Sequence, residues 1–149
     1  MRVVLRTIRN HFFSAFREIF VYHHTSLEFR AKIYALMIAS TDEPIHHYHS
    51  ALEEIASEIY SESDRAATLV MTVQEYVSTV HAKKMIDHQS LLNDIIQELR
   101  LMPRYAQKIE SEHLRKLQSC TQEKDSKIYQ DRIIDFLNQK RLDFEEIRH

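Results

Sequence analysis

The sequence contains no glycine, and this absence removes several kinds of site at once. Glycine supplies the positive φ angles of tight hairpin turns and the bare backbone of phosphate-binding loops. Neither the Gly-rich P-loop nor the Gly-rich dinucleotide fingerprint can therefore occur in this chain. Proline is present only as Pro44 and Pro103, so long stretches are free of both helix breakers. The two shortages favour an all-helical protein.

Cysteine and long apolar runs are also scarce. Cys120 is the sole cysteine, which excludes an internal disulfide and fits a reducing compartment. No apolar run approaches the roughly 18 residues of a membrane-spanning helix. The run from Phe12 to Phe16 is too short and interrupted for a signal peptide core. We therefore expect a cytoplasmic protein.

Neither sign of charge dominates the chain. The 20 basic and 22 acidic residues leave a net charge of −2, so no global field favours nucleic acid or an anionic membrane. Apolar residues make up 44% and charged residues 28%, a balance typical of soluble globular proteins. The 149 residues fit one domain, residues 1–149, with a core that needs no disulfide or structural metal.

The stretch Phe29 to Ser40, FRAKIYALMIAS, organises the rest of the chain. On a helix its apolar side chains point almost all the way round, which indicates a central helix covered on every side. Helices with one apolar stripe are predicted over 3–22, 44–60, 64–81, from Asp87 onward, from Pro103 to Leu117, and over 126–147. The apolar set of the last helix is Ile128, Ile133, Ile134, Leu137, Leu142 and Phe144. The pattern predicts a compact all-α bundle of about seven helices.

Two segments of the chain match when the sequence is shifted by 40 residues. Apolar positions then fall on apolar positions: Phe29, Ile33, Leu36, Met37, Ile45, Leu52, Ile55 and Ile59 on Leu69, Val73, Tyr76, Val77, Met85, Leu92, Ile95 and Leu99. Two copies are fewer than the three or more that a solenoid requires. We therefore expect two pseudo-repeated helix pairs, built as similar antiparallel hairpins, with the first and last helices packed across them.

The residues from Ala35 to Ile45, ALMIASTDEPI, followed by Leu52-Glu53-Glu54-Ile55-Ala56, resemble the TerB-like domain of tellurite-resistance proteins and of some DnaJ-like co-chaperones. That signature has a small-residue-rich helix, Asp-Gly-x-Ile, a glutamate four residues later and a Leu-x-x-Ile-Ala helix. Asp42 and Ile45 match it, whereas Glu43 and His49 stand at the glycine and glutamate positions. The resemblance covers about 29–99 and implies a helical domain with a repeated pair, associated with stress response or co-chaperone work.

The predicted first helix has a basic flank. Its arginines fall together beside two phenylalanines, and only Glu18 opposes them. The candidate partner-binding residues are Arg2, Arg6, Arg9, Phe13, Arg17 and Phe20. The partner we favour is another protein, and an acidic surface on it would suit these arginines; a membrane surface comes second and nucleic acid last. The sequence does not indicate an oligomeric state.

Histidines suggest an alternative site on the predicted third helix. His46, His49 and Glu53 are spaced i, i+3 and i+7, with Asp42 at the N-terminal end of the helix, and imidazole and carboxylate groups together bind zinc or a similar divalent metal ion. The competing interpretation is a solvated first turn, because these residues lie mostly off the apolar stripe. Protonation of the ten histidines would also make the chain responsive to pH.

Catalysis has little support in the sequence. Cys120 has no base next to it in the sequence, and paired acids such as Glu53-Glu54 and Glu145-Glu146 point about 100° apart on a helix. No cofactor is expected apart from the alternative metal ion. We therefore expect a non-catalytic interaction or adaptor domain that binds a partner through its basic first helix. The alternative is a metal-binding or pH-responsive stress sensor that uses the region from Asp42 to Glu53.

Overall fold

The computed structural model describes residues 25–82 and 87–148 of the chain. Over these residues it contains six α-helices, two short 3-10 helices and no strand. In chain order they are α2 (Thr25–Ala39), η1 (Ile45–Tyr48), α3 (His49–Ile59), α4 (Ser63–His81), α5 (His88–Leu101), η2 (Pro103–Lys108), α6 (Ser111–Gln118) and α7 (Lys124–Arg148). The predicted all-α fold is confirmed, while the helix predicted over 3–22 lies outside the described residues.

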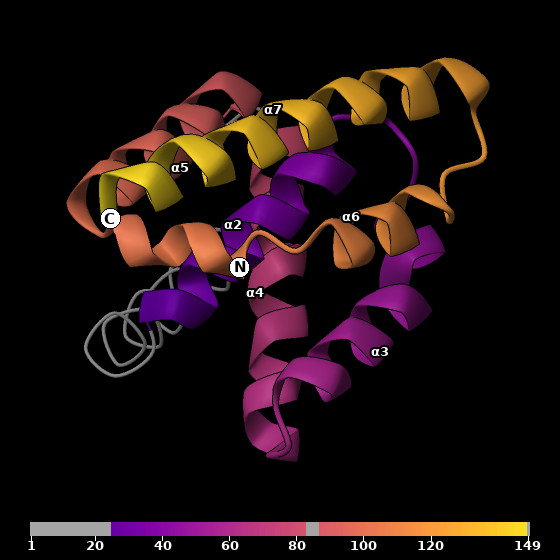
Figure 1. Cartoon of the computed structure of the whole chain (residues 1–149). Coiled ribbons are helices and arrows are strands. Elements are labelled where there is room, and N and C mark those ends of the chain that lie inside the picture. Colours follow the sequence, from indigo (N-terminus) through magenta and orange to yellow (C-terminus); the bar gives the residue numbers. More distant parts are fainter. Residues whose placement is uncertain (1–24, 83–86, 149) are drawn as a thin grey trace, which may run out of the picture.

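Helix α2 lies at the centre of the molecule (Figure 1). Every residue from Leu27 to Ile38 is buried, as the all-round apolar sequence predicts. The helix contacts α4, α5, α6 and η2, so neighbours cover it from several directions. Its side chains join those of the other helices in one hydrophobic core. The central role predicted for this stretch is confirmed.

Three charged side chains of α2 are buried together with the apolar ones: Glu28, Arg30 and Lys32. Each has a hydrogen-bond partner on another element, as buried charges require. The pairs are Tyr76 Oη with Glu28 Oε1 at 2.5 Å, Arg30 Nη1 with Glu110 Oε1 at 3.1 Å, and Lys32 Nζ with Glu98 Oε2 at 3.1 Å. Burial raises the pKa of the Glu98 carboxyl although Lys32 lies beside it. The polar residues of α2 thus fix the positions of α4, α5 and the η2–α6 segment around it.

The two predicted helix pairs correspond to α2 with α3 and α4 with α5. Of their matched apolar positions, those on α2, α4 and α5 are largely buried. The packing differs from the expected hairpins, because the extensive contacts are α2 with α4, α3 with α4, and α2 with α5. The second helix of each pair therefore packs on the first helix of the other pair. The α3–α4 contact follows from the short connection over 60–62, which makes these two helices neighbours.

Two details of the predicted helices are wrong. The helix expected from Pro103 to Leu117 is interrupted, because Ile109 and Glu110 have extended backbone angles that separate η2 from α6. In α7, Ile128 and Leu142 belong to the predicted apolar set but are 49% and 55% exposed. The other members, Ile133, Ile134, Leu137 and Phe144, are buried as expected. Gln130, by contrast, is completely buried, because its side chain forms hydrogen bonds with distant segments of the chain.

None of the helices within the described residues combines the length and the apolar character that crossing a bilayer requires.

The burial of α2 leads to a test of stability. Ile33 is 0% exposed at the centre of α2, so Ile33→Ala should lower the free energy of unfolding by about 2–5 kcal/mol through lost burial and a residual cavity. Ile128→Ala makes the same chemical change at a side chain that is 49% exposed, and should lower the free energy of unfolding by about 0.5 kcal/mol or less. Urea unfolding of both variants provides the measurement. Equal losses would contradict the central position of α2.

Candidate functional site

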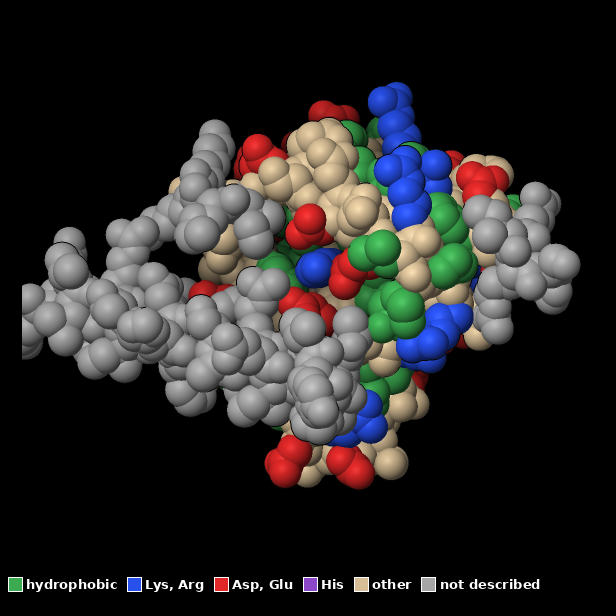
Figure 2. Space-filling model, turned by 90° about the vertical axis from the view of Figure 1, so that its left-hand side faces the viewer, with side chains coloured by type: hydrophobic (Ala, Val, Ile, Leu, Met, Phe, Trp, Pro, Cys, Tyr) green, Lys and Arg blue, Asp and Glu red, His purple; other side chains and the backbone are tan. Residues whose placement is uncertain are grey.

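The predicted partner-binding residues of the first helix are not among the described residues. They are Arg2, Arg6, Arg9, Phe13, Arg17 and Phe20, and their role stays a prediction. The surface that the structure does describe is mixed in charge on one face (Figure 2). Acidic and basic side chains alternate there with hydrophobic ones, without a large area of one sign.

The four predicted metal ligands are not brought together as a set. Asp42 is exposed in the turn after α2, and His46 is exposed on η1. Only His49 and Glu53 meet, with His49 Nε2 2.7 Å from Glu53 Oε1 on α3. Within residues 25–82 and 87–148, no group of three or more His, Cys, Asp or Glu side chains is arranged to hold a metal ion. His46 belongs to the 3-10 helix η1 and His49 to α3, so the two do not lie on one regular α-helix as the prediction assumed.

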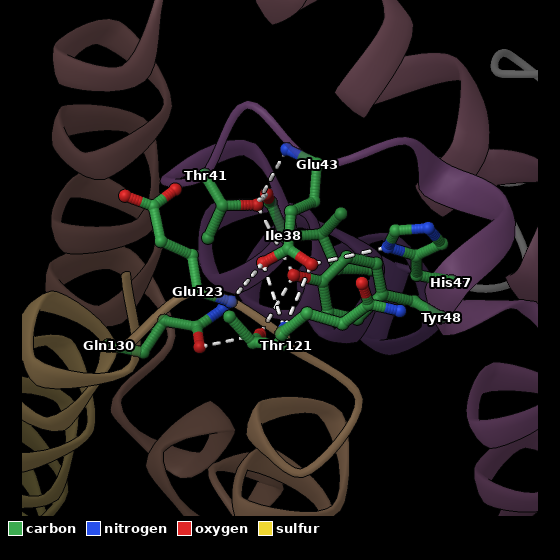
Figure 3. A network of polar contacts seen from close by, with 9 residues as sticks. Ile38, Thr41, Glu43, His47, Tyr48, Thr121, Glu123 and Gln130 are labelled. Carbon is green, nitrogen blue, oxygen red and sulfur yellow. Dashed lines mark hydrogen bonds and ion pairs between the residues drawn. The ribbon is translucent and has the colours of Figure 1, made fainter. Parts of the chain in front are cut away.

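Glu43, the residue after Asp42, has a structural role that the sequence did not reveal (Figure 3). Its carboxylate accepts hydrogen bonds from the backbone N–H of Gln122 at 2.9 Å and of Glu123 at 3.5 Å, directly before α7 begins. His47 Nδ1 lies 3.2 Å from the same carboxylate. Glu43 therefore caps the N-terminus of a helix about 80 residues away in the sequence, where anionic groups are stabilising.

A buried chain of hydrogen bonds lies beside this cap. Gln130 Nε2 donates to the Met37 carbonyl at 3.0 Å, so the Gln130 Oε1 accepts, and the Thr121 hydroxyl donates to it at 2.8 Å. The Thr121 oxygen is then the acceptor for the Tyr48 hydroxyl, 2.8 Å away. Tyr48 Oη also lies 3.2 Å from Thr41 Oγ1. These contacts join the end of α2 and the start of α3 to the α6–α7 connection.

A second chain of polar contacts, which ends at the exposed Glu58, links α2, α3 and α6. His113 lies with Nδ1 3.3 Å from Tyr34 Oη and with Nε2 3.2 Å from Glu58 Oε2. Tyr–His–Glu contacts occur in some active sites, but burial raises the pKa of the Tyr34 hydroxyl and makes it a poorer proton donor. Tyr34 is also 0% exposed, so a substrate has no access to its oxygen. The arrangement satisfies buried polar groups and does not resemble a working nucleophile.

An open groove lies between α3 and α4 on the described surface. It has a volume of about 450 Å³. One stripe of each helix lines it: His49, Glu53, Ala56 and Ser57 from α3, and Ser63, Ala66, Ala67, Val70, Met71 and Gln74 from α4. Figure 1 shows the two helices diverging from the turn that joins them. Alanine and serine side chains are too small to fill the space between diverging helices, and the groove results.

At one end of this groove, three polar side chains form hydrogen bonds with one another. Gln74 Nε2 donates to His49 Nδ1 at 3.0 Å, so the neutral imidazole carries its proton on Nε2. That Nε2–H then donates to Glu53 Oε1. Because the three groups bond to one another across the mouth, the surface left for a ligand is the apolar part. Met71 is 43% exposed there, and Val70, Ala56 and Ala66 form the floor.

The helices around the groove are acidic. From His49 to His81 the chain carries Glu53, Glu54, Glu58, Glu62, Asp64 and Glu75, with Arg65 as the sole lysine or arginine. Lys116 of α6 pairs with Glu54 and Glu58 on the side away from the groove. Acidic side chains are visible at the lower tip of the molecule in Figure 2, where α3 turns into α4 in Figure 1.

Cys120 gives no indication of a reactive site. Its thiol is half-buried and lies 3.6 Å from the Lys116 carbonyl, to which it donates.

Comparison of the chain with protein-family models, with curated proteins and with solved structures gives no match. The resemblance to the TerB-like group therefore stays a prediction.

The Glu43 cap leads to a prediction about pH. Partial burial opposes the charged form of Glu43, but hydrogen bonds from Gln122, His47 and Glu123 outweigh it and hold the pKa of the carboxyl below its usual value. A lowered pKa means that the charged cap stabilises the fold above the ordinary glutamate pKa of about 4.3, and that this stabilisation is lost as the pH falls through the lower, folded-state pKa. Glu43→Gln should therefore cost about 1 kcal/mol at pH 7, and the difference from wild type should shrink below about pH 4.

Urea unfolding at several pH values measures this difference. Asp135→Asn makes the same carboxylate-to-amide change at an exposed residue in the middle of α7, and as the matched control it should show a much smaller effect at pH 7. A cost of Glu43→Gln that grows as the pH falls would show that the carboxylate does not act as a charged cap.

Proposed function

We propose that this chain is a non-catalytic helical binding module that holds another protein in the groove between α3 and α4. The observation that carries the proposal is the groove itself, with an apolar floor, a partly exposed Met71 and a polar rim. Protein interfaces have this organisation, with apolar anchors in the middle and polar groups around them.

The lining of the groove favours a protein ligand over a small substrate. Small-molecule sites commonly combine aromatic walls with a few polar groups aimed at the ligand. Among the described residues, no aromatic side chain apart from His49 lines this groove, and the polar groups of His49, Gln74 and Glu53 are directed at one another. An apolar surface with internally satisfied polar neighbours supplies area for packing and little for chemistry.

Two predictions from the sequence fit the same proposal. The basic helix over 3–22 would provide a second contact surface for a protein partner. The TerB-like resemblance would associate the module with stress response or with a co-chaperone. Both supplement the groove, and neither is needed for it to bind.

Photo-crosslinking of the full chain in the cells that naturally produce it tests the proposal. With the photoreactive residue benzoylphenylalanine replacing Met71, irradiation should join the chain to a second protein. The same residue replacing Ile128 on α7, which is similarly exposed, should give no such adduct. Ala67→Phe fills the groove and should remove the Met71 adduct, whereas Ala82→Phe, at an exposed alanine at the end of α4 and outside the groove, should not.

Two results would refute the groove as a binding site. One is that Met71 and Ile128 give the same adducts, which would indicate random collision. The other is that Met71 gives no adduct with a second protein.

A further inference from the structure

The chemistry of the groove ligand can be inferred from the shape and charge of the groove. We infer that the α3–α4 groove takes one face of a short basic amphipathic α-helix of a partner protein. This inference rests on the proposed function and adds to it the conformation and the charge of the partner segment.

A helical ligand fits the described surface better than an extended one. Peptides bind in extended form chiefly by adding a strand to a sheet edge, and residues 25–82 and 87–148 contain no strand. Proline-rich segments bind between aromatic side chains, and His49 is the sole aromatic ring that the described part of the chain contributes to this lining. The remaining common mode places the apolar face of a helix in a groove between helices.

The dimensions of the groove limit how the helix lies. The lining stripe spans His49 to Ser57 on α3 and Ser63 to Gln74 on α4, or about 12 and 17 Å at 1.5 Å per residue. This length accommodates about 8–11 residues of a ligand helix. A volume of about 450 Å³ over that length gives a mean cross-section of roughly 30 Å², well below the ~80–110 Å² of a whole helix. The ligand helix therefore lies along the groove and inserts only the side chains of one face.

The lining residues suit this mode of contact. Ala56, Ala66 and Ala67 let a second helix come close, and Val70 and Met71 offer apolar surface for its anchors. Met71 has a flexible, polarisable side chain that adapts to differently shaped partners. Anchors spaced i, i+3, i+4 and i+7 on the ligand would meet this surface over two to three turns.

The charge around the groove selects a basic helix. Glu53 is on the rim and 61% exposed, and Glu62 and Asp64 are exposed at the end where α3 turns into α4. Arg65, the sole lysine or arginine of the two helices, has its guanidinium 4.8 Å from the centre of the Tyr60 ring, with Nε buried. Lysine or arginine on the flanks of the ligand helix would face these carboxylates, whereas glutamate there would be repelled.

The test uses the full chain and fluorescently labelled peptides of about twelve residues, enough to span the groove. The first peptide carries leucines at i, i+3, i+4 and i+7 with lysines on both flanks. The second has glutamate in place of every lysine, and the third is a scrambled form of the first that loses the apolar face. Fluorescence anisotropy should show binding of the first peptide, weakening with salt, and at least about tenfold weaker binding of the other two.

Variants of the chain locate the binding and its charge preference. Ala67→Phe should weaken binding of the basic peptide by at least about tenfold, while Ala82→Phe leaves it unchanged. Glu53→Lys should weaken it about threefold to tenfold, and Glu123→Lys, an exposed change on the α6–α7 connection, should have a smaller effect. Circular dichroism and urea unfolding show whether each variant is folded. If Ala67→Phe does not fold, Glu53→Lys still tests the inference.

Several outcomes would overturn the inference. One is equal binding of the basic and acidic peptides, and another is binding that Ala67→Phe leaves intact. Self-association in analytical ultracentrifugation that Ala67→Phe abolishes would identify a second copy as the occupant. A Met71 crosslink to residues 1–24 of the same chain would identify that segment. A Met71 adduct with another protein, together with no charge preference, would preserve the proposed function and refute this inference alone, whereas no adduct refutes the proposed function.

Discussion

The structure depends on the complete burial of helix α2. A helix covered on all sides cannot leave a charged group to water, so Glu28, Arg30 and Lys32 each need a partner within the protein. Tyr76, Glu110 and Glu98 provide the partners, from α4, the η2–α6 connection and α5. Hydrophobic burial favours packing of these elements on α2, and the polar pairs determine which residue of each element faces α2. This combination limits the ways in which the same apolar surfaces could pack.

The end of α2 and the start of α7 stabilise each other. The last carbonyls of a helix lack partners within it, and the Met37 carbonyl receives Gln130 Nε2 from α7 and Ser40 Oγ from the following turn. The backbone N–H groups of Gln122 and Glu123, just before α7, also lack partners within a helix. The carboxylate of Glu43, from the turn after α2, accepts hydrogen bonds from both. Each helix terminus is thus capped by a residue belonging to or adjoining the other helix. This exchange also explains the burial of a glutamine on the inner face of α7.

The proposed binding groove is a consequence of the same framework. Helix α4 packs on α2, and α3 is tied to α6 and to the α6–α7 connection through His113 with Glu58 and through Tyr48 with Thr121. Both helices are held by contacts on their inner sides, and α3 and α4 also contact each other, while their outer stripes line the groove. The small side chains of Ala56, Ser57 and Ala67 leave the space between them open. The groove is therefore presented by helices whose positions other contacts determine.

The sequence alone determined the fold class and the central helix. The absence of glycine, the 3.6-residue periodicity and the all-round apolar stretch Phe29 to Ser40 are local properties, and they predicted the helices of the described region and the burial of α2. Periodicity could not show that Ile128 faces solvent while Gln130 faces the core, because the partners of Gln130 lie on distant segments. The same holds for Glu43, whose cap joins segments about 80 residues apart, and for the exchange of partners between the two helix pairs. Only the tertiary structure placed the lining residues of α3 and α4 opposite each other. A groove depends on the relative position of two helices, and the sequence of neither helix specifies that position by itself.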